Sequence, residues 1–261
     1  MQNAQSTTGA ARPRQAGCLH LFQAFGVPVF VHWTWGLLLA FVVATDPMGL
    51  GPAWGTAALI GLFAIVTLHE YGHALATLSV GGRADRIVLW PLGGVAIVSP
   101  PPRPGAVLWS IAAGPLVNVA LVPVLGLLAW GVGAVPTVAT DGSVVFGSMS
   151  GLQELVFWLA TVNVVLLVFN LLPVYPLDGG QMVQAVLWMF IGRANSLRVS
   201  AIFGLVVSLG LAGLMLVSGA WTGRPMLFLI ALYIAWSSFR SLMVANLLAQ
   251  LERMQGRHVE P

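Results

Sequence analysis

Long apolar runs limit the folds open to this sequence more than any other feature. Only 7% of its 261 residues are charged, whereas an ordinary soluble domain carries about 25%. A helix needs roughly 20 mostly apolar residues to cross the hydrocarbon core of a bilayer. Stretches that reach or approach this length lie at residues 27–45, 54–80, 106–135, 155–172, 199–218 and 225–242. The sequence therefore predicts an all-α membrane protein with about six transmembrane helices.

The remaining composition excludes several classes of protein. A single cysteine, Cys18, cannot form a disulfide within the chain or build a thiolate zinc site. The net charge is only +3 and the arginines are scattered, so we expect a lipid bilayer around the chain and no nucleic-acid partner. The domain organisation that we predict is a polar tail at 1–26, a membrane domain at 27–251 and a second tail at 252–261; the oligomeric state is left open.

The arginines predict an orientation. Cytoplasmic loops of membrane proteins carry an excess of Lys and Arg, and this chain has eleven Arg and no Lys. If the N-terminus lies inside, six helices place ten of the eleven arginines on the cytoplasmic side and only Arg224 outside. We therefore expect both termini in the cytoplasm and, because the composition suits a GC-rich bacterium, a bacterial inner membrane.

One apolar segment is too short to cross a membrane. Residues 87–99 are rich in Ile and Val and contain Pro91, Gly93 and Gly94. Irregular or extended backbone is tolerated at membrane depth only where protein or water covers it. The segment is therefore predicted to be a strand pair or a re-entrant loop near the cytoplasmic side.

Ionisable residues concentrate in the second predicted helix, where they are costly and therefore indicate function. Residues 69–73 read His-Glu-Tyr-Gly-His, and two histidines four apart project from one face of a helix and can bind one metal ion. Glu70 is offset by about 100° around the helix, so it can reach the attacking water rather than the metal. This pattern suits a catalytic zinc ion with Glu70 as general base.

Two histidines leave a catalytic zinc site short of one protein ligand, and Asp178 can supply it. It follows the fourth predicted helix in a segment broken by two prolines and followed by two glycines. His69 lies about 15 residues, or roughly 22 Å, from the outer end of its helix. Both halves of the site are therefore expected at the cytoplasmic side of the membrane.

These paired motifs resemble the site-2 protease family of intramembrane zinc metalloproteases, peptidase family M50. The resemblance rests on residues 69–73 together with 170–179, and it extends to residues 31–33, 91–95 and 113–118. It implies a catalytic core at about 54–181, one Zn²⁺ per chain and a transmembrane protein as substrate. A bacterial member with neither a PDZ domain nor CBS modules is expected.

The resemblance also assigns roles to residues. His69, His73 and Asp178 would bind zinc, and Glu70 would be the general base. Asn170 is expected near the scissile carbonyl. Gly93 and Gly94 are expected in a strand that pairs with unwound substrate, and such a strand edge can hold a peptide extended.

Some interpretations remain open. Asn118 could contact substrate or join helices by hydrogen bonds, which polar side chains commonly do in membranes. A metal-ion transporter could also carry His and carboxylate ligands, although it would spread them along a path and would give Glu70 no role. A catalytically inactive protein that binds membrane helices is the third hypothesis. The intact set of ligands and Glu70 favour the protease.

Overall fold

Long helices dominate the computed structural model, which describes residues 17–91, 93–134, 137–138, 144–145 and 149–257. Within these residues, five helices are long and apolar enough to cross a membrane. They are α2 (Pro52–Ser79), α3 (Pro104–Gly131), α4 (Gly151–Leu171), α6 (Arg193–Val217) and α8 (Pro225–Arg257). Three shorter helices are α1 (Thr34–Thr45), α5 (Asp178–Ile191) and α7 (Ala220–Gly223).

The first predicted transmembrane helix, at residues 27–45, is not one helix. It divides into strand β2 (Val27–His32) and helix α1, which has only 12 residues and is too short to cross a bilayer as a helix. Alternating valines and a phenylalanine favour a strand over the first six residues, and a proline among them disfavours a helix. That strand pairs with β1 (Cys18–Ala24), so the predicted polar tail at 1–26 includes a strand.

The short segment at 87–99 forms a strand pair, which is one of the two predicted alternatives. It belongs to β3 (Arg83–Trp90) and β4 (Gly93–Ser99), which pair antiparallel in a four-stranded sheet of order β1-β2-β3-β4. Strands β2 and β3 run parallel, and the chain between them passes through α1 and α2. A separate two-stranded sheet joins β5 (Thr137–Val138) to β6 (Val144–Val145). Because β4 comes last in the order of the four-stranded sheet, it is an edge strand of that sheet.

The larger sheet packs against α2 at the turns that carry the His-Glu-Tyr-Gly-His motif. Val27, Val29, Ile87 and Leu89 of the sheet are fully or almost fully buried in one cluster with Tyr71 of α2. The hydroxyl of Tyr71 donates a hydrogen bond to the carbonyl of Val27 at 3.0 Å. The sheet thereby covers the motif-bearing part of α2 and places β4 beside it.

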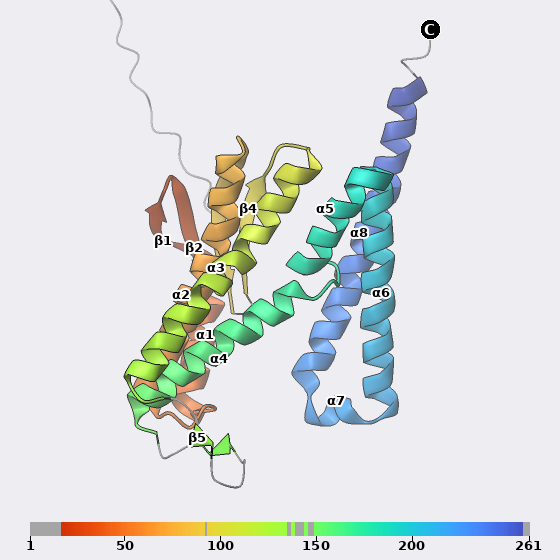
Figure 1. The fold of residues 1–261 in the computed structure, drawn as a ribbon. Coiled ribbons are helices and arrows are strands. Elements are labelled where there is room, and N and C mark those ends of the chain that lie inside the picture. Colours follow the sequence, from red (N-terminus) through yellow and green to blue (C-terminus); the bar gives the residue numbers. More distant parts are fainter. Residues whose placement is uncertain (1–16, 92, 135–136, 139–143, 146–148, 258–261) are drawn as a thin grey trace, which may run out of the picture.

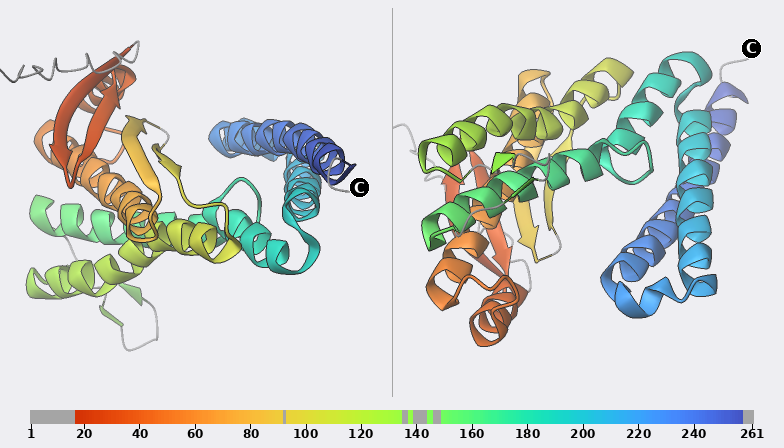
Figure 2. Two further views of the ribbon diagram at one scale, coloured as in Figure 1. Left: turned by 90° about the horizontal axis from the view of Figure 1, so that it is seen from above. Right: turned by 60° about the horizontal axis from the view of Figure 1, so that its bottom comes forward.

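The helices form two groups. Helices α2, α3 and α4 pack on one another, and α6 and α8 form an antiparallel hairpin closed by α7 (Figure 1). Helix α5 packs against both α3 and α6 and so connects the two groups, as Figure 2 also shows. The junction of α5 and α6 and the C-terminal end of α8 lie at one end of the molecule, and α7 lies at the other (Figure 1). The connecting helix α5 begins at Asp178, one of the predicted metal ligands.

Candidate metal centre

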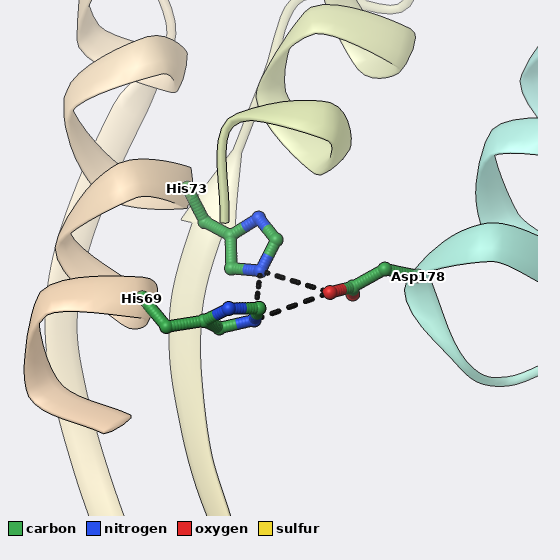
Figure 3. Close-up of side chains that lie close together, drawn as sticks. All are labelled: His69, His73 and Asp178. Carbon is green, nitrogen blue, oxygen red and sulfur yellow. Dashed lines mark hydrogen bonds and ion pairs between the residues drawn. The ribbon is translucent and has the colours of Figure 1, made fainter. Parts of the chain in front are cut away.

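Three side chains from two helices converge on one point (Figure 3). The Nε2 atom of His69 lies 3.2 Å from Oδ2 of Asp178 and 3.1 Å from Nε2 of His73. The Nε2 atom of His73 lies 3.5 Å from the same carboxylate oxygen. The three ligand atoms all lie within 4.8 Å of one another. The structure therefore brings together the three residues that sequence analysis predicted as a metal site.

Helix α2 presents both histidines from one face because they are four residues, or about one turn, apart. His69 is only 4% exposed, and the face that carries it packs against α3. Gly72 makes this packing close: a Cβ atom there would collide with the backbone of Ala113. The histidines thus point into the space between α2, α3 and α5.

Asp178 is held by the irregular segment between α4 and α5. Helix α4 ends at Leu171, two residues before Pro173, and Asp178 is the first residue of α5. Gly179 and Gly180 face backbone atoms of this segment, so a Cβ atom at either position would collide with the chain. The sequence predicted an irregular site here, and the structure refines it to a tight turn that starts a helix with Asp178 in its first turn.

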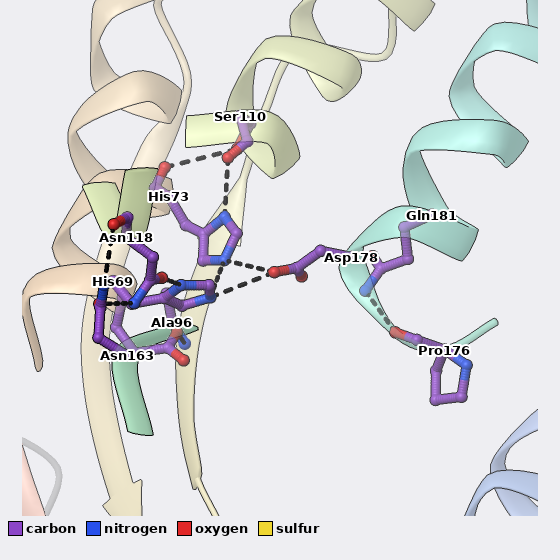
Figure 4. Close-up of polar contacts among 10 residues, drawn as sticks. His69, His73, Ala96, Ser110, Asn118, Asn163, Pro176, Asp178 and Gln181 are labelled. Carbon is purple, nitrogen blue, oxygen red and sulfur yellow. Dashed lines mark hydrogen bonds and ion pairs between the residues drawn. The ribbon is translucent and has the colours of Figure 1, made fainter. Parts of the chain in front are cut away.

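Hydrogen bonds to the other ring nitrogens define the tautomers of both histidines (Figure 4). Nδ1 of His73 lies 2.9 Å from the carbonyl oxygen of Ser110, which can only accept a hydrogen bond. Nδ1 of His69 lies 2.5 Å from Oδ1 of Asn118. Each Nδ1 therefore carries the proton in the neutral ring, and each Nε2 turns a lone pair toward Asp178.

These residues fit a bound cation. Two Nε2 lone pairs and a buried carboxylate oxygen that receives no hydrogen bond would repel one another without a positive charge between them. Space is available at that point because Gly114 has no side chain, and a Cβ atom there would overlap both imidazole rings.

Glu70 lies next to the three ligands but turns toward the sheet. Its side chain is buried, at 6% exposure, and Oε2 accepts a hydrogen bond of 2.7 Å from the backbone N–H of Ala96 in β4. Gly94 of β4 leaves room for it, because a Cβ atom at that position would overlap the Glu70 side chain. The predicted base and the edge strand are therefore in direct contact.

The other predicted residues lie around this centre. Gly93 starts β4 with φ of 145°, a conformation that favours glycine. Asn170 is half-buried in the last turn of α4. Asn118 is fully buried and donates from Nδ2 to Oδ1 of Asn163 at 2.8 Å.

Sequence reasoning missed Asn163 and Ser110. Asn163 is a polar residue inside an apolar helix, which is a signal that the sequence offered. The role of Ser110 depends on its backbone carbonyl and on a contact of its hydroxyl with Thr77, and neither leaves a trace in the sequence.

Comparison with known proteins identifies the family. Residues 57–217 match the model of peptidase family M50. A zinc metalloprotease of Methanocaldococcus jannaschii is 29% identical over 216 residues, which cover 83% of this chain and 58% of the relative. Rip3 of Mycobacterium tuberculosis, also named as a zinc metalloprotease, is 34% identical over 219 residues, or 75% of this chain and 52% of the relative.

A solved structure agrees with this assignment. The site-2 protease from M. jannaschii superposes with a TM-score of 0.60 at 28% identity, covering 86% of this chain and 95% of that structure. The chain therefore belongs to peptidase family M50, as its motifs indicated, and is an integral membrane protein. It spans about half the length of the curated relatives that it matches.

Proposed function

We propose that this protein is a zinc metalloendopeptidase that hydrolyses a peptide bond in or near a transmembrane segment of another membrane protein. The observation that carries the proposal is the convergence of His69, His73 and Asp178 on one buried point beside Glu70. Membership of family M50 and the names of the relatives support it.

His69, His73 and Asp178 would hold one zinc ion per chain. Two imidazole nitrogens and one carboxylate oxygen are a common ligand set for catalytic zinc, and three protein ligands leave a position open. A zinc ion bound there supplies a Lewis acid that polarises the scissile carbonyl and activates a water molecule. The convergent lone pairs and the space at Gly114 support this assignment.

Glu70 would move the proton. A buried carboxylate beside the ligands can accept a proton from the attacking water and pass it to the departing amine. Its hydrogen bond to Ala96 restricts the orientation of the carboxylate. Catalysis by Glu70 then takes place directly against the edge of β4.

The edge of β4 would hold the substrate. Because backbone groups alternate between the two sides of a strand, the N–H of Ala96 and the backbone groups of Gly94 and Val98 face away from β3. An extended peptide can add to such an edge, which exposes carbonyls that a helical substrate would hide. Gly93 and Gly94 would allow close approach, and Asn170 would lie near the scissile carbonyl.

The orientation follows from the arginines. Arg83 begins β3, Arg103 precedes α3 and Arg193 begins α6, whereas Arg224 follows α7 at the opposite end of the hairpin. Arg240 lies within α8. The positive-inside rule then favours an orientation in which the metal site and the C-terminal end of α8 face the cytoplasm, in a bacterial inner membrane. A site at that depth suits regulated intramembrane proteolysis, in which a membrane-held regulator is released.

Metal content and cleavage of a model membrane substrate in detergent test the proposal together. About one zinc per chain is expected in the wild type and in Glu70→Gln, and less in Asp178→Asn. Cleavage is expected to fall by about 10²- to 10⁴-fold in Glu70→Gln, because the proton acceptor is lost. Glu252→Gln, a change at an exposed carboxylate near the end of α8, is the matched control.

The outcomes separate the hypotheses. Cleavage by Glu70→Gln at the wild-type rate would contradict the proposed mechanism. Zinc bound normally by Asp178→Asn would remove the third ligand. A metal-ion transporter or an inactive binding protein would show zinc binding with no Glu70-dependent cleavage of any substrate.

A further inference from the structure

Two asparagines are fully buried between membrane-spanning helices, behind the metal centre. Asn118 of α3 and Asn163 of α4 are both 0% exposed. Buried amides are costly unless their donors and acceptors are paired, and this holds with greater force in a membrane. Asn163 is also the only buried residue of α4. The cost of burying two amides suggests that this pair has a function in addition to packing α3 against α4.

A backbone carbonyl fixes the direction of every hydrogen bond in this group (Figure 4). The carbonyl oxygen of Asn118 can only accept, so the atom of Asn163 that lies 3.0 Å from it is the donor Nδ2. Oδ1 of Asn163 then faces the other way and accepts from Nδ2 of Asn118 at 2.8 Å. Only one orientation of each amide satisfies both bonds.

The orientation of the Asn118 amide also determines which of its atoms faces Nδ1 of His69. With Nδ2 of Asn118 committed to Asn163, Oδ1 of Asn118 is turned to Nδ1 of His69 at 2.5 Å. An amide oxygen accepts and cannot donate, so the proton of the neutral imidazole lies on Nδ1 and the lone pair on Nε2. This is the tautomer in which Nε2 can bind a metal ion.

We propose that Asn118 and Asn163 are positioning residues for His69. Asn118 holds the ring in its metal-binding tautomer and orientation, and Asn163 acts through Asn118 by keeping its amide from flipping. This role rests on the zinc site proposed above. Partners of this kind behind a metal-bound histidine typically contribute 10- to 100-fold to metal affinity or activity.

The two histidines differ in a way that makes the role testable. His73 is oriented by the backbone carbonyl of Ser110, which no side-chain substitution removes. His69 depends on a side chain. If the asparagines served only to join α3 to α4, their bonds to each other would suffice, and the identity of the atom facing His69 would be irrelevant.

Zinc affinity of the full-length protein in detergent, measured by competition with a chelator, tests the role without relying on activity. Asn118→Leu is expected to weaken zinc binding by about 10- to 100-fold, since no acceptor remains for Nδ1 of His69. Asn163→Leu is expected to weaken it by about 3- to 10-fold, because the Asn118 amide becomes free to flip. Asn118→Asp is expected to stay within about threefold of the wild type, because a carboxylate also accepts from Nδ1.

The visible absorption of the Co²⁺-substituted protein provides a second measurement, because it reports the geometry at the metal. We expect a changed spectrum for Asn118→Leu and a spectrum close to the wild type for Asn118→Asp. Ser208→Ala is the control: Ser208 is equally buried in a spanning helix, but its hydroxyl bonds to the carbonyl of Gly204 in its own helix. It should leave both the affinity and the spectrum unchanged.

Distinct results would overturn the positioning role and the zinc site. Wild-type affinity and spectrum in Asn118→Leu would overturn the role, as would equal losses in Asn118→Leu and Asn118→Asp. If Asn118→Leu does not fold, wild-type affinity and spectrum in Asn163→Leu would overturn it instead. Failure of the wild type itself to bind zinc would refute the proposed function.

Discussion

The helices around the metal centre and the α6–α8 hairpin are similar in length and apolar character but differ in what they bury. In the first group, buried polar side chains bond from one helix to another, as His69, Asn118 and Asn163 do. In the hairpin, buried serines lie among alanines, and Ser208 bonds only within its own helix. Small residues let membrane helices pack closely, whereas polar bonds between helices fix their side chains in one arrangement. The first group therefore holds its polar side chains in a fixed arrangement, as a reactive site requires, whereas the hairpin mainly packs two helices closely.

Two buried serines of the hairpin depart from this pattern. Ser196 of α6 accepts a hydrogen bond of 3.1 Å from Nε2 of Gln184 in α5. Ser238 of α8 donates a hydrogen bond of 2.8 Å to the carbonyl of Tyr175, in the segment that leads to Asp178. Gly204 of α6 leaves room for the same carbonyl, which a Cβ atom would otherwise meet. The hairpin thus contacts the segment that leads to Asp178. Substitutions in the two regions can show how much each contributes to zinc affinity and to cleavage.

The largest effect is expected at Gly114, where the first group leaves space for the metal. In Gly114→Ala, the added methyl group would overlap the imidazoles of His69 and His73. Zinc affinity should fall by tenfold or more, and cleavage by about 10²-fold, the usual cost of misplacing a catalytic group by about 1 Å. Chelator competition and a cleavage assay measure the two losses.

The matched control for this prediction is Gly126→Ala, because Gly126 lies in the same helix and an added Cβ atom there would meet nothing within 4 Å apart from the adjacent backbone of its own helix. It should behave as the wild type in both assays. Normal zinc binding by Gly114→Ala would show that the ligands do not meet where the structure places them.

A smaller and more selective effect is expected at Gly94 of β4. An alanine there would push against the Glu70 side chain, so cleavage should fall by about 10- to 100-fold while zinc content stays at the wild-type level. Val95→Ala is the control on the same strand, since Val95 is exposed and lies next to it. Equal loss of zinc and of cleavage in Gly94→Ala would mean that the strand supports the ligands rather than the base.

The smallest effect is expected in the hairpin. Ser238→Ala removes one hydrogen bond, and such bonds in membranes contribute about 0.6 kcal/mol on average. Zinc affinity should therefore fall by about threefold at most. Ser241→Ala removes a bond within α8 only and should leave zinc affinity unchanged. A loss of tenfold or more in Ser238→Ala would show that the hairpin controls the metal site.

The sequence predicted that His69, His73 and Asp178 come together, because their positions follow from simple periodicity. Histidines four apart must share a helix face, and the depth of Asp178 could be counted along the fourth predicted helix. The strand pair near residues 87–99 was also predicted, because its length excludes a membrane crossing and its residues favour strands.

The first predicted helix failed for a physical reason. Residues 27–45 are continuously apolar, and hydropathy alone does not distinguish a strand followed by a short helix from one long helix. Pairing with β1 and β3 decides the outcome, and this contact spans distant parts of the chain. Asn163 was missed for the same reason, since its meaning depends on Asn118, 45 residues away.

X-ray absorption at the zinc edge tests the central claim most directly. The ligand set His69, His73 and Asp178 predicts about one zinc per chain, with imidazole nitrogens and oxygen at about 2.0–2.2 Å and no sulfur at about 2.3 Å. A double substitution of His69 and His73 by leucine should remove the metal. A sulfur ligand in the wild type, or zinc retained in the double variant, would contradict the proposed metal centre.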